Sequence, residues 1–254
     1  MRITGSRHRR VAAAVLCLAL LSGCAAGEPD GNPSGSAAAT ASASSAAGQA
    51  SGAAPLPKAS VKGWKVYSDP DRTVSFELPA DWIVQRQAKP TMPSDGGVHL
   101  NVRDAAGKVV AELHTRLKVP KEKCGPGEAK EYSVVLTEPA KVASAGGKDS
   151  IKPLFVFRTL LGYQYFGSYG LTDQPGGDGI SACRLQNTVA GPKPVGVYSF
   201  ANAAVHGAPA PGQDTGALEM FGLIAEAKAF TQTERFKTIK QVIKSLKIHE
   251  EGKA

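Results

Sequence analysis

The 254-residue sequence contains no apolar run of the roughly 20 residues that a membrane-spanning helix needs. Signatures of catalysis are also missing. Gly167-Ser168-Tyr169-Gly170 lacks the spacing of a nucleophile elbow, and Gly146-Gly147-Lys148-Asp149 lacks the first glycine and the hydroxyl residue of a phosphate-binding loop. We therefore predict a protein without catalytic residues, without a bound metal and without a cofactor.

The first 23 residues have the three parts of a secretory signal peptide. Four arginines and no acidic residue precede a short apolar run, residues 11–21. Leu21-Ser22-Gly23-Cys24 then resembles a bacterial lipobox, in which the cysteine after the cut is acylated, palmitate being one such acyl group. We predict that residues 1–23 are removed and that lipid on Cys24 anchors the protein on the extracytoplasmic side of the cell membrane. The alternative, an uncleaved anchor helix, is disfavoured because the run is too short.

Residues 25–58 are almost entirely Ala, Ser, Gly and Pro, with Leu56 as the one large apolar residue. A segment of this composition cannot bury enough apolar surface to offset the entropy of ordering it. We predict that residues 24–58 form a disordered tether. As a flexible coil, the tether would span about 30–35 Å.

Cysteine is scarce, with four in the chain. Cys17 belongs to the signal peptide and Cys24 to the lipobox, so Cys124 and Cys183 are left as one pair in an exported protein. A disulfide between them is the expected outcome on an oxidising side of the membrane. The alternatives are a metal site or two free thiols, but the turn around Cys124 has no histidine or second cysteine.

Residues 59–250 are enough for one domain, and their alternation of apolar and polar residues predicts strands. The longest alternation, 108–119, places Glu112 and His114 on the face opposite Leu113, which predicts an antiparallel sheet with one wet face. The composition of residues 217–230 favours helix and their alternation favours strand; we predict a strand that pairs with 195–203. The other predicted strands are 73–78, 98–103, 131–137, 154–161, 163–171 and 181–189.

The C-terminal part of the domain has the clearest helical pattern. Thr231 and Glu234 have the spacing of a capping box. The apolar residues that follow have helical spacing and predict a helix over 232–246 that packs on the sheet; they are Phe236, Ile239, Val242, Ile243 and Leu246. Four lysines flank that stripe, as a solvated face or as contacts to anionic headgroups. They are Lys237, Lys240, Lys244 and Lys247.

Two parts of this domain resemble a known family. The run Tyr67-Ser68-Asp69-Pro70, the run Val74-Ser75-Phe76-Glu77-Leu78-Pro79 with Trp82, and the last helix resemble PsbP-like domains. That family includes the photosystem extrinsic subunit and many bacterial lipoproteins. The resemblance covers about a fifth of the domain. It implies an α+β fold, an antiparallel β-sheet flanked by helices in an α/β/α sandwich.

The densest aromatic group is the candidate binding site. Tyr163, Tyr165 and Tyr169 can line a groove for a sugar or a lipid, because tyrosine combines an apolar body with a polar tip. Arg158, in a neighbouring apolar strand, can hold an anion there. The alternative is ordinary packing across a sheet, with Arg158 extending its head to solvent. His99 and His114 share the polar face of a hairpin, but no third ligand is spaced to complete a metal site.

These features favour a binding or accessory module at the cell envelope. Its partners would be the bilayer, through acylated Cys24, and an envelope protein or small ligand. Removing the four arginines of the signal peptide lowers the formal charge from +8 to +4, which together with secretion argues against nucleic acid. The alternatives are an envelope hydrolase with an unrecognised site, or the ligand-binding component of a transport system.

The lipobox hypothesis predicts the behaviour of a Cys24→Ala variant. Stable anchoring depends on the burial of two or more acyl chains, each CH₂ group contributing about 0.8 kcal/mol. We expect the variant to accumulate as unprocessed precursor or to be released into the medium, as measured by fractionation and immunoblotting. Membrane retention of a processed Cys24→Ala protein would contradict the hypothesis.

Overall fold

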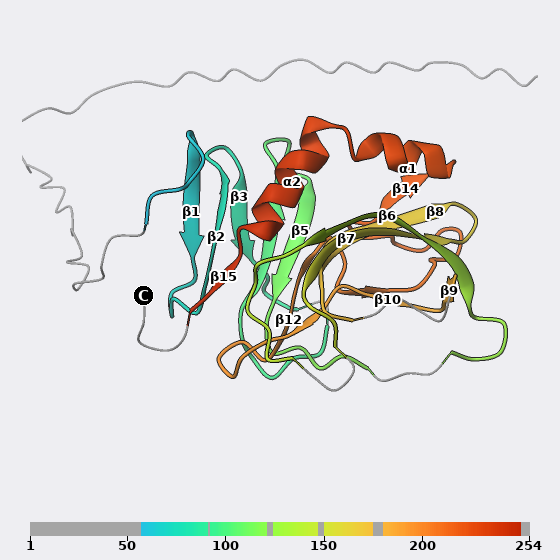
Figure 1. Ribbon diagram of the computed structural model, residues 1–254, viewed down its shortest axis with the longest axis horizontal. Coiled ribbons are helices and arrows are strands. Elements are labelled where there is room, and N and C mark those ends of the chain that lie inside the picture. The colour runs from blue at the N-terminus through green and yellow to red at the C-terminus, as the bar shows by residue number, and fades with distance from the viewer. Residues whose placement is uncertain (1–56, 91, 121–123, 147–149, 175–179, 250–254) are drawn as a thin grey trace, which may run out of the picture. The chain divides into compact units, whose positions relative to one another are not determined.

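The computed structural model describes residues 57–90, 92–120, 124–146, 150–174 and 180–249. Within these ranges the chain is mostly antiparallel β-structure with two short helices (Figure 1). The signal peptide, Cys24 and nearly all of the tether lie outside the described residues, so they remain predictions.

The largest sheet contains ten strands, eight of them on one continuous antiparallel path. In spatial order the path is β3 (Ile83–Arg86), β4 (His99–Arg103), β5 (Val109–His114), β12 (Val197–Ala201), β8 (Tyr165–Thr172), β7 (Leu154–Leu161), β6 (Lys130–Pro139) and β9 (Ser181–Ala182). Two further strands join it: β11 (Val189–Ala190) pairs with β12, and β14 (Glu219–Phe221) pairs with β8. Figure 1 shows that β6, β7 and β8 curve strongly.

Two smaller sheets complete the β-structure. One has the order β1 (Trp64–Ser68), β2 (Val74–Pro79) and β15 (Lys247–Ile248), so the two ends of the domain pair with each other. The other joins β10 (Leu185–Gln186) to β13 (Val205–His206). Its two strands lie on either side of β11 and β12 in the sequence.

One face of the large sheet carries the hydrophobic core. Helices α1 (Ile224–Phe230) and α2 (Glu234–Lys244) pack on this face, and α2 crosses it in front of β5 (Figure 1). Phe236 of α2 is completely buried, and its ring contacts four aromatic rings. These are Phe155, Phe157, Tyr169 and Phe230, at centroid distances of 5.2–6.1 Å. The predicted apolar stripe of this helix is therefore confirmed as a core face.

The predicted fold class is wrong. The large antiparallel sheets dominate the described residues, and the two helices, of seven and eleven residues, do not flank a sheet as in an α/β/α sandwich. The sequence carries helical periodicity only near its end. The additional helices came from the PsbP-like resemblance, not from the residues.

The prediction of one strand over 217–230 is also wrong. The segment divides into β14 and α1, and β14 pairs with β8 instead of with residues 195–203. The helix begins where the Glu226 carboxylate accepts hydrogen bonds from the backbone N–H groups of Gly222 and Leu223. The predicted capping box of Thr231 and Glu234 is wrong: Thr233 is the N-cap of α2, and it accepts from the Phe236 N–H.

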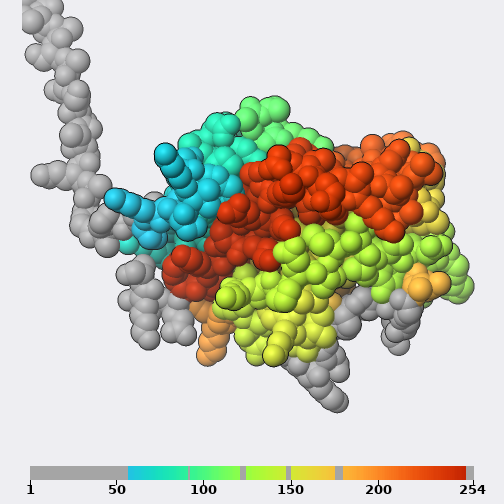
Figure 2. Space-filling model, turned by 45° about the horizontal axis from the view of Figure 1, so that its top comes forward, coloured from blue at the N-terminus to red at the C-terminus, as the bar shows by residue number. Residues whose placement is uncertain are grey.

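Lysines 240 and 244 of α2 do not form a free basic surface. Both ammonium groups donate to the Glu138 carboxylate on β6. These two hydrogen bonds hold the pKa of Glu138 below its ordinary value. They also fasten α2 to β6, beside which it lies in Figure 2.

The predicted disulfide is confirmed. Cys124 and Cys183 are bonded, with Cα atoms 5.7 Å apart. The bond closes a 59-residue separation and joins the segment before β6 to the one between β9 and β10. It therefore fixes the region 180–190 at the edge of the domain.

The buried ring of Phe236 predicts a large effect of truncation. Phe236→Ala should lower the free energy of unfolding by about 3–5 kcal/mol, because it removes a fully buried aromatic side chain and leaves a cavity. Lys237→Ala, on the exposed side of the same helix, should change it by less than about 0.5 kcal/mol. Urea unfolding of both variants tests this. Equal, small effects would show that α2 is peripheral to the core.

Candidate functional site

The face of the large sheet opposite the helices, called here the polar face, is buried although its side chains are polar. Strand register places His99, His114 and Ser199 side by side on β4, β5 and β12. Ala201 is two residues from Ser199 and so shares its face, and it pairs with Gly170. Ser168, two residues from Gly170, therefore lies on the same face, with Arg158 as its cross-strand partner. These five residues are at most 8% exposed.

Residues 183–188 and 203–217, on either side of β11 and β12 in the sequence, cover part of the polar face, and hydrogen bonds attach them to it. His206 Nε2 lies 2.7 Å from Ser168 Oγ. One Nη of Arg158 donates to the Gln186 carbonyl at 2.6 Å and to the Asn187 side-chain oxygen at 2.9 Å. The disulfide at Cys183 restrains the same covering segment.

Asn202 attaches the next part of the cover to the sheet. Its side-chain oxygen accepts from the Tyr169 N–H at 2.8 Å, and its side-chain nitrogen donates to the carbonyls of Gly167 and Ala217. The residue therefore bridges β8 and the chain just before β14, and it fixes both ends of the loop 203–217.

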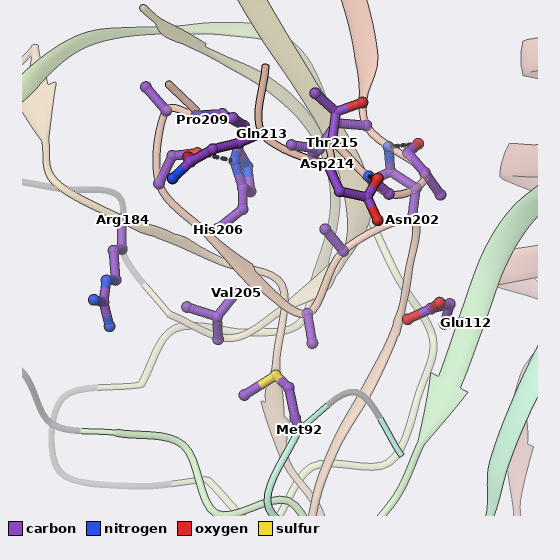
Figure 3. Close-up of a pocket in the computed structure, with 17 residues that line it drawn as sticks. Met92, Glu112, Arg184, Asn202, Val205, His206, Pro209, Gln213, Asp214 and Thr215 are labelled. Atoms are coloured by element: carbon purple, nitrogen blue, oxygen red, sulfur yellow. Dashed lines mark hydrogen bonds between the residues drawn. The ribbon is translucent and has the colours of Figure 1, made fainter. Parts of the chain in front are cut away.

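A pocket of about 490 Å³ opens between this loop and β5 (Figure 3). It is lined by residues 202–209 and 213–218 together with Met92, Glu112 and Arg184. The lining contains no Phe, Tyr or Trp, and its larger apolar side chains are Met92, Val205 and Leu218. Backbone groups and small side chains form most of the wall, which suits a polar ligand better than an acyl chain.

Glu112 lines the pocket and is connected by hydrogen bonds to two buried histidines. His114 Nε2 lies 3.0 Å from a Glu112 carboxylate oxygen, and His114 Nδ1 lies 3.0 Å from His99 Nδ1. At the far end, His99 Nε2 contacts Ser94 Oγ at 3.0 Å and the Gly96 carbonyl at 3.2 Å. Burial, then the proximity of His114, lowers the pKa of His99, which favours its neutral form.

A neutral His99 allows two proton arrangements along this chain. With its proton on Nδ1, His99 donates to His114, and Ser94 donates to His99 Nε2. With its proton on Nε2, it donates to the Gly96 carbonyl and accepts from His114 Nδ1. In both arrangements His114 Nε2 lies within hydrogen-bond distance of the Glu112 carboxylate. The chain thus orients Glu112 toward the pocket whichever form is present.

The Ser168–His206 contact has the distance of a nucleophile and its general base. A backbone carbonyl, that of Gly207, lies 2.9 Å from the other ring nitrogen, Nδ1. Ser168, however, is completely buried within β8. Burial, and to a smaller extent the charge of Arg158, lowers the pKa of His206 to about 4. A serine without access to solvent and a base this weak form a structural hydrogen bond, so the pair does not support a hydrolase.

The structure separates the four residues of the predicted aromatic groove. Tyr169 is buried on the helix-covered face, where its hydroxyl donates to the Val110 carbonyl, and Tyr165 packs partly against the same core. Tyr163 is 50% exposed in the turn before β8, with its ring against Phe166. Arg158 lies on the polar face. None of the four lines the 490 Å³ pocket.

The polar hairpin face was predicted to be wet, and this is wrong. His99 and His114 are 8% and 0% exposed. The alternation also ends early: β5 stops at His114, and Arg116 adopts a positive φ of 54°. Sequence reasoning also missed Glu112, Arg184 and Asp214 as pocket residues, because they meet only through the fold of the covering segment.

Comparison of the chain with family models, with curated proteins and with solved structures finds no match. Among the described residues, no group of three or more His, Cys, Asp and Glu side chains is arranged to hold a metal ion. Neither of the two described helices has the length and apolar composition to cross a membrane.

The buried His206 predicts a pH dependence of stability. Its folded pKa of about 4 lies below the ordinary 6.5, so the unfolded chain takes up the proton first as pH falls. Stability should therefore decline between pH 6.5 and 4, by about 3 kcal/mol at most from this residue. Urea unfolding at several pH values should give a shallower decline for His206→Gln than for the wild type. Parallel curves would contradict the assignment.

Proposed function

We propose that the protein is a lipid-anchored binding module on the extracytoplasmic side of the cell membrane, held through Cys24. Its domain binds a small polar ligand in the pocket beside Glu112. The observation that carries the proposal is the pocket itself, about 490 Å³ and lined by backbone groups, carboxylates and a guanidinium. Cavities of this size are typical of small-molecule sites.

A binding role fits the chemistry of the polar face better than catalysis. The serine closest to a histidine base is enclosed within the sheet, and His206 is directed to Ser168 and Gly207 instead of to a substrate. The charged side chains at the pocket are Glu112, Arg184 and Asp214, which can hold a ligand but include no nucleophile paired with a base.

The tether predicted from the composition of residues 24–58 fits a module that works near the membrane. A flexible segment over residues 24–58 would let the domain sample about 30–35 Å from its anchor. That reach permits the domain to collect a ligand in the space next to the bilayer and to present it to an envelope protein.

Filling the pocket tests the proposal. Thr215 lines the pocket, and Thr215→Trp should occupy much of its volume. Thr137→Trp is the matched control, because Thr137 is exposed on β6 and away from the lining residues. The full chain and both variants are purified from their host, and bound small molecules are extracted for mass spectrometry.

We expect one compound to accompany the wild type and the Thr137→Trp control at stoichiometric levels, and to be lost from Thr215→Trp. Circular dichroism verifies that the three proteins are equally folded. Identical extracts from all three would show that the pocket holds no ligand and would overturn the proposal.

A further inference from the structure

The charged groups at the pocket are separated by sign. Figure 3 shows Glu112 and Asp214 on one side and Arg184 on the other. The first two come from β5 and from the loop before β14, and the third directly follows the disulfide residue Cys183. Elements far apart in the sequence thus converge with opposite charges at opposite sides of one cavity.

Each of these groups can bind a ligand while keeping its own contacts. One oxygen of Asp214 accepts from the Gly216 N–H at 2.9 Å, and one oxygen of Glu112 is 3.0 Å from His114. A carboxylate offers about four lone-pair sites, and a guanidinium offers five N–H donors. The carboxylates of Asp214 and Glu112 can therefore accept hydrogen bonds from a ligand in addition to these contacts.

The lining excludes other ligand classes. Sugars and nucleobases are usually held by stacking on Phe, Tyr or Trp, none of which lines this pocket, and both ring nitrogens of the lining residue His206 are bonded to Ser168 and Gly207. An acyl chain needs a continuous apolar wall, whereas the wall here is mostly backbone and small side chains. A short ligand with charged ends and a polar middle satisfies both the separated charges and the exposed backbone.

We infer that the pocket binds a small zwitterion, an amino acid or a short peptide. Its ammonium group faces Asp214 and Glu112, and its carboxylate faces Arg184. This inference rests on the proposed binding function and specifies its ligand class. Asp214 and Arg184 are then the residues that determine specificity.

The test uses isothermal titration of the full chain with three short probes that carry different charged ends. Glycylglycine carries both charges, N-acetylglycylglycine carries the carboxylate alone, and putrescine carries ammonium groups alone. We expect glycylglycine to bind at least about 10-fold more tightly than either of the others, since each lost charged contact has that order of effect.

Matched variants assign the two ends. Asp214→Asn retains the oxygen that accepts from Gly216 and should weaken glycylglycine binding about 10-fold or more, whereas Asp81→Asn, an exposed control away from the pocket, should not. Arg184→Gln should weaken the same probe by a similar factor, with exposed Arg86→Gln as its control.

Two results would overturn the inference while leaving the binding function intact. Equal binding of N-acetylglycylglycine, blocked by Thr215→Trp, would remove the ammonium requirement. Equal binding of putrescine, unaffected by Arg184→Gln, would remove the carboxylate requirement and leave a simple cation site. If no probe binds, the zwitterion is wrong, and the extracted compound of the pocket-filling experiment decides separately whether the pocket binds anything.

Discussion

A polar sheet face that is buried must have hydrogen-bond partners for its side chains, and this requirement determines how the second half of the domain is arranged. An unpartnered buried polar group destabilises the folded state by about 1–3 kcal/mol. The covering segment supplies partners at particular points: His206 for Ser168, and Gln186 and Asn187 for Arg158. Its position is therefore set by directional bonds, whereas the helices on the opposite face are held mainly by aromatic packing.

This difference explains why the polar face holds a cavity. The helix-covered face is filled by large rings such as Phe157 and Phe236. The loop 203–217 consists largely of Ala, Gly and Pro, whose side chains are too small to fill the space that the hydrogen bonds define. Asn202 and the disulfide fix the borders of that loop and of the neighbouring segment, so the loop does not need to collapse onto the sheet.

Sequence reasoning succeeded where the pattern is local. The spacing of Phe236, Ile239 and Ile243 is set within one helix, and all three are buried. The cysteine pair could be matched because Cys124 and Cys183 are the two cysteines that remain after the predicted processing and acylation. The strand 154–161 was predicted with the bounds that β7 has. In each case no distant element was needed to interpret the pattern.

It failed where a distant element decides the environment. Alternation correctly placed His114 opposite Leu113, but it cannot reveal whether the polar face meets water or another part of the chain. Residues 183–188 and 203–217 cover Arg158 and Ser168, far along the chain from either. Ser94 and Gly96, before β4, contact His99. The pocket was missed for the same reason, because Glu112 and Asp214 meet only once the cover is in place.

The polar face also holds buried polar groups that lack a hydrogen-bond partner. Among the described residues, Ser199 Oγ and Arg158 Nε are buried without a hydrogen-bond partner. Arg158 further has no carboxylate partner there, and burial lowers its pKa to about 10. Unsatisfied buried groups lower the free energy that local opening requires. Regions that open locally commonly carry ligand sites, and the pocket lies at this face.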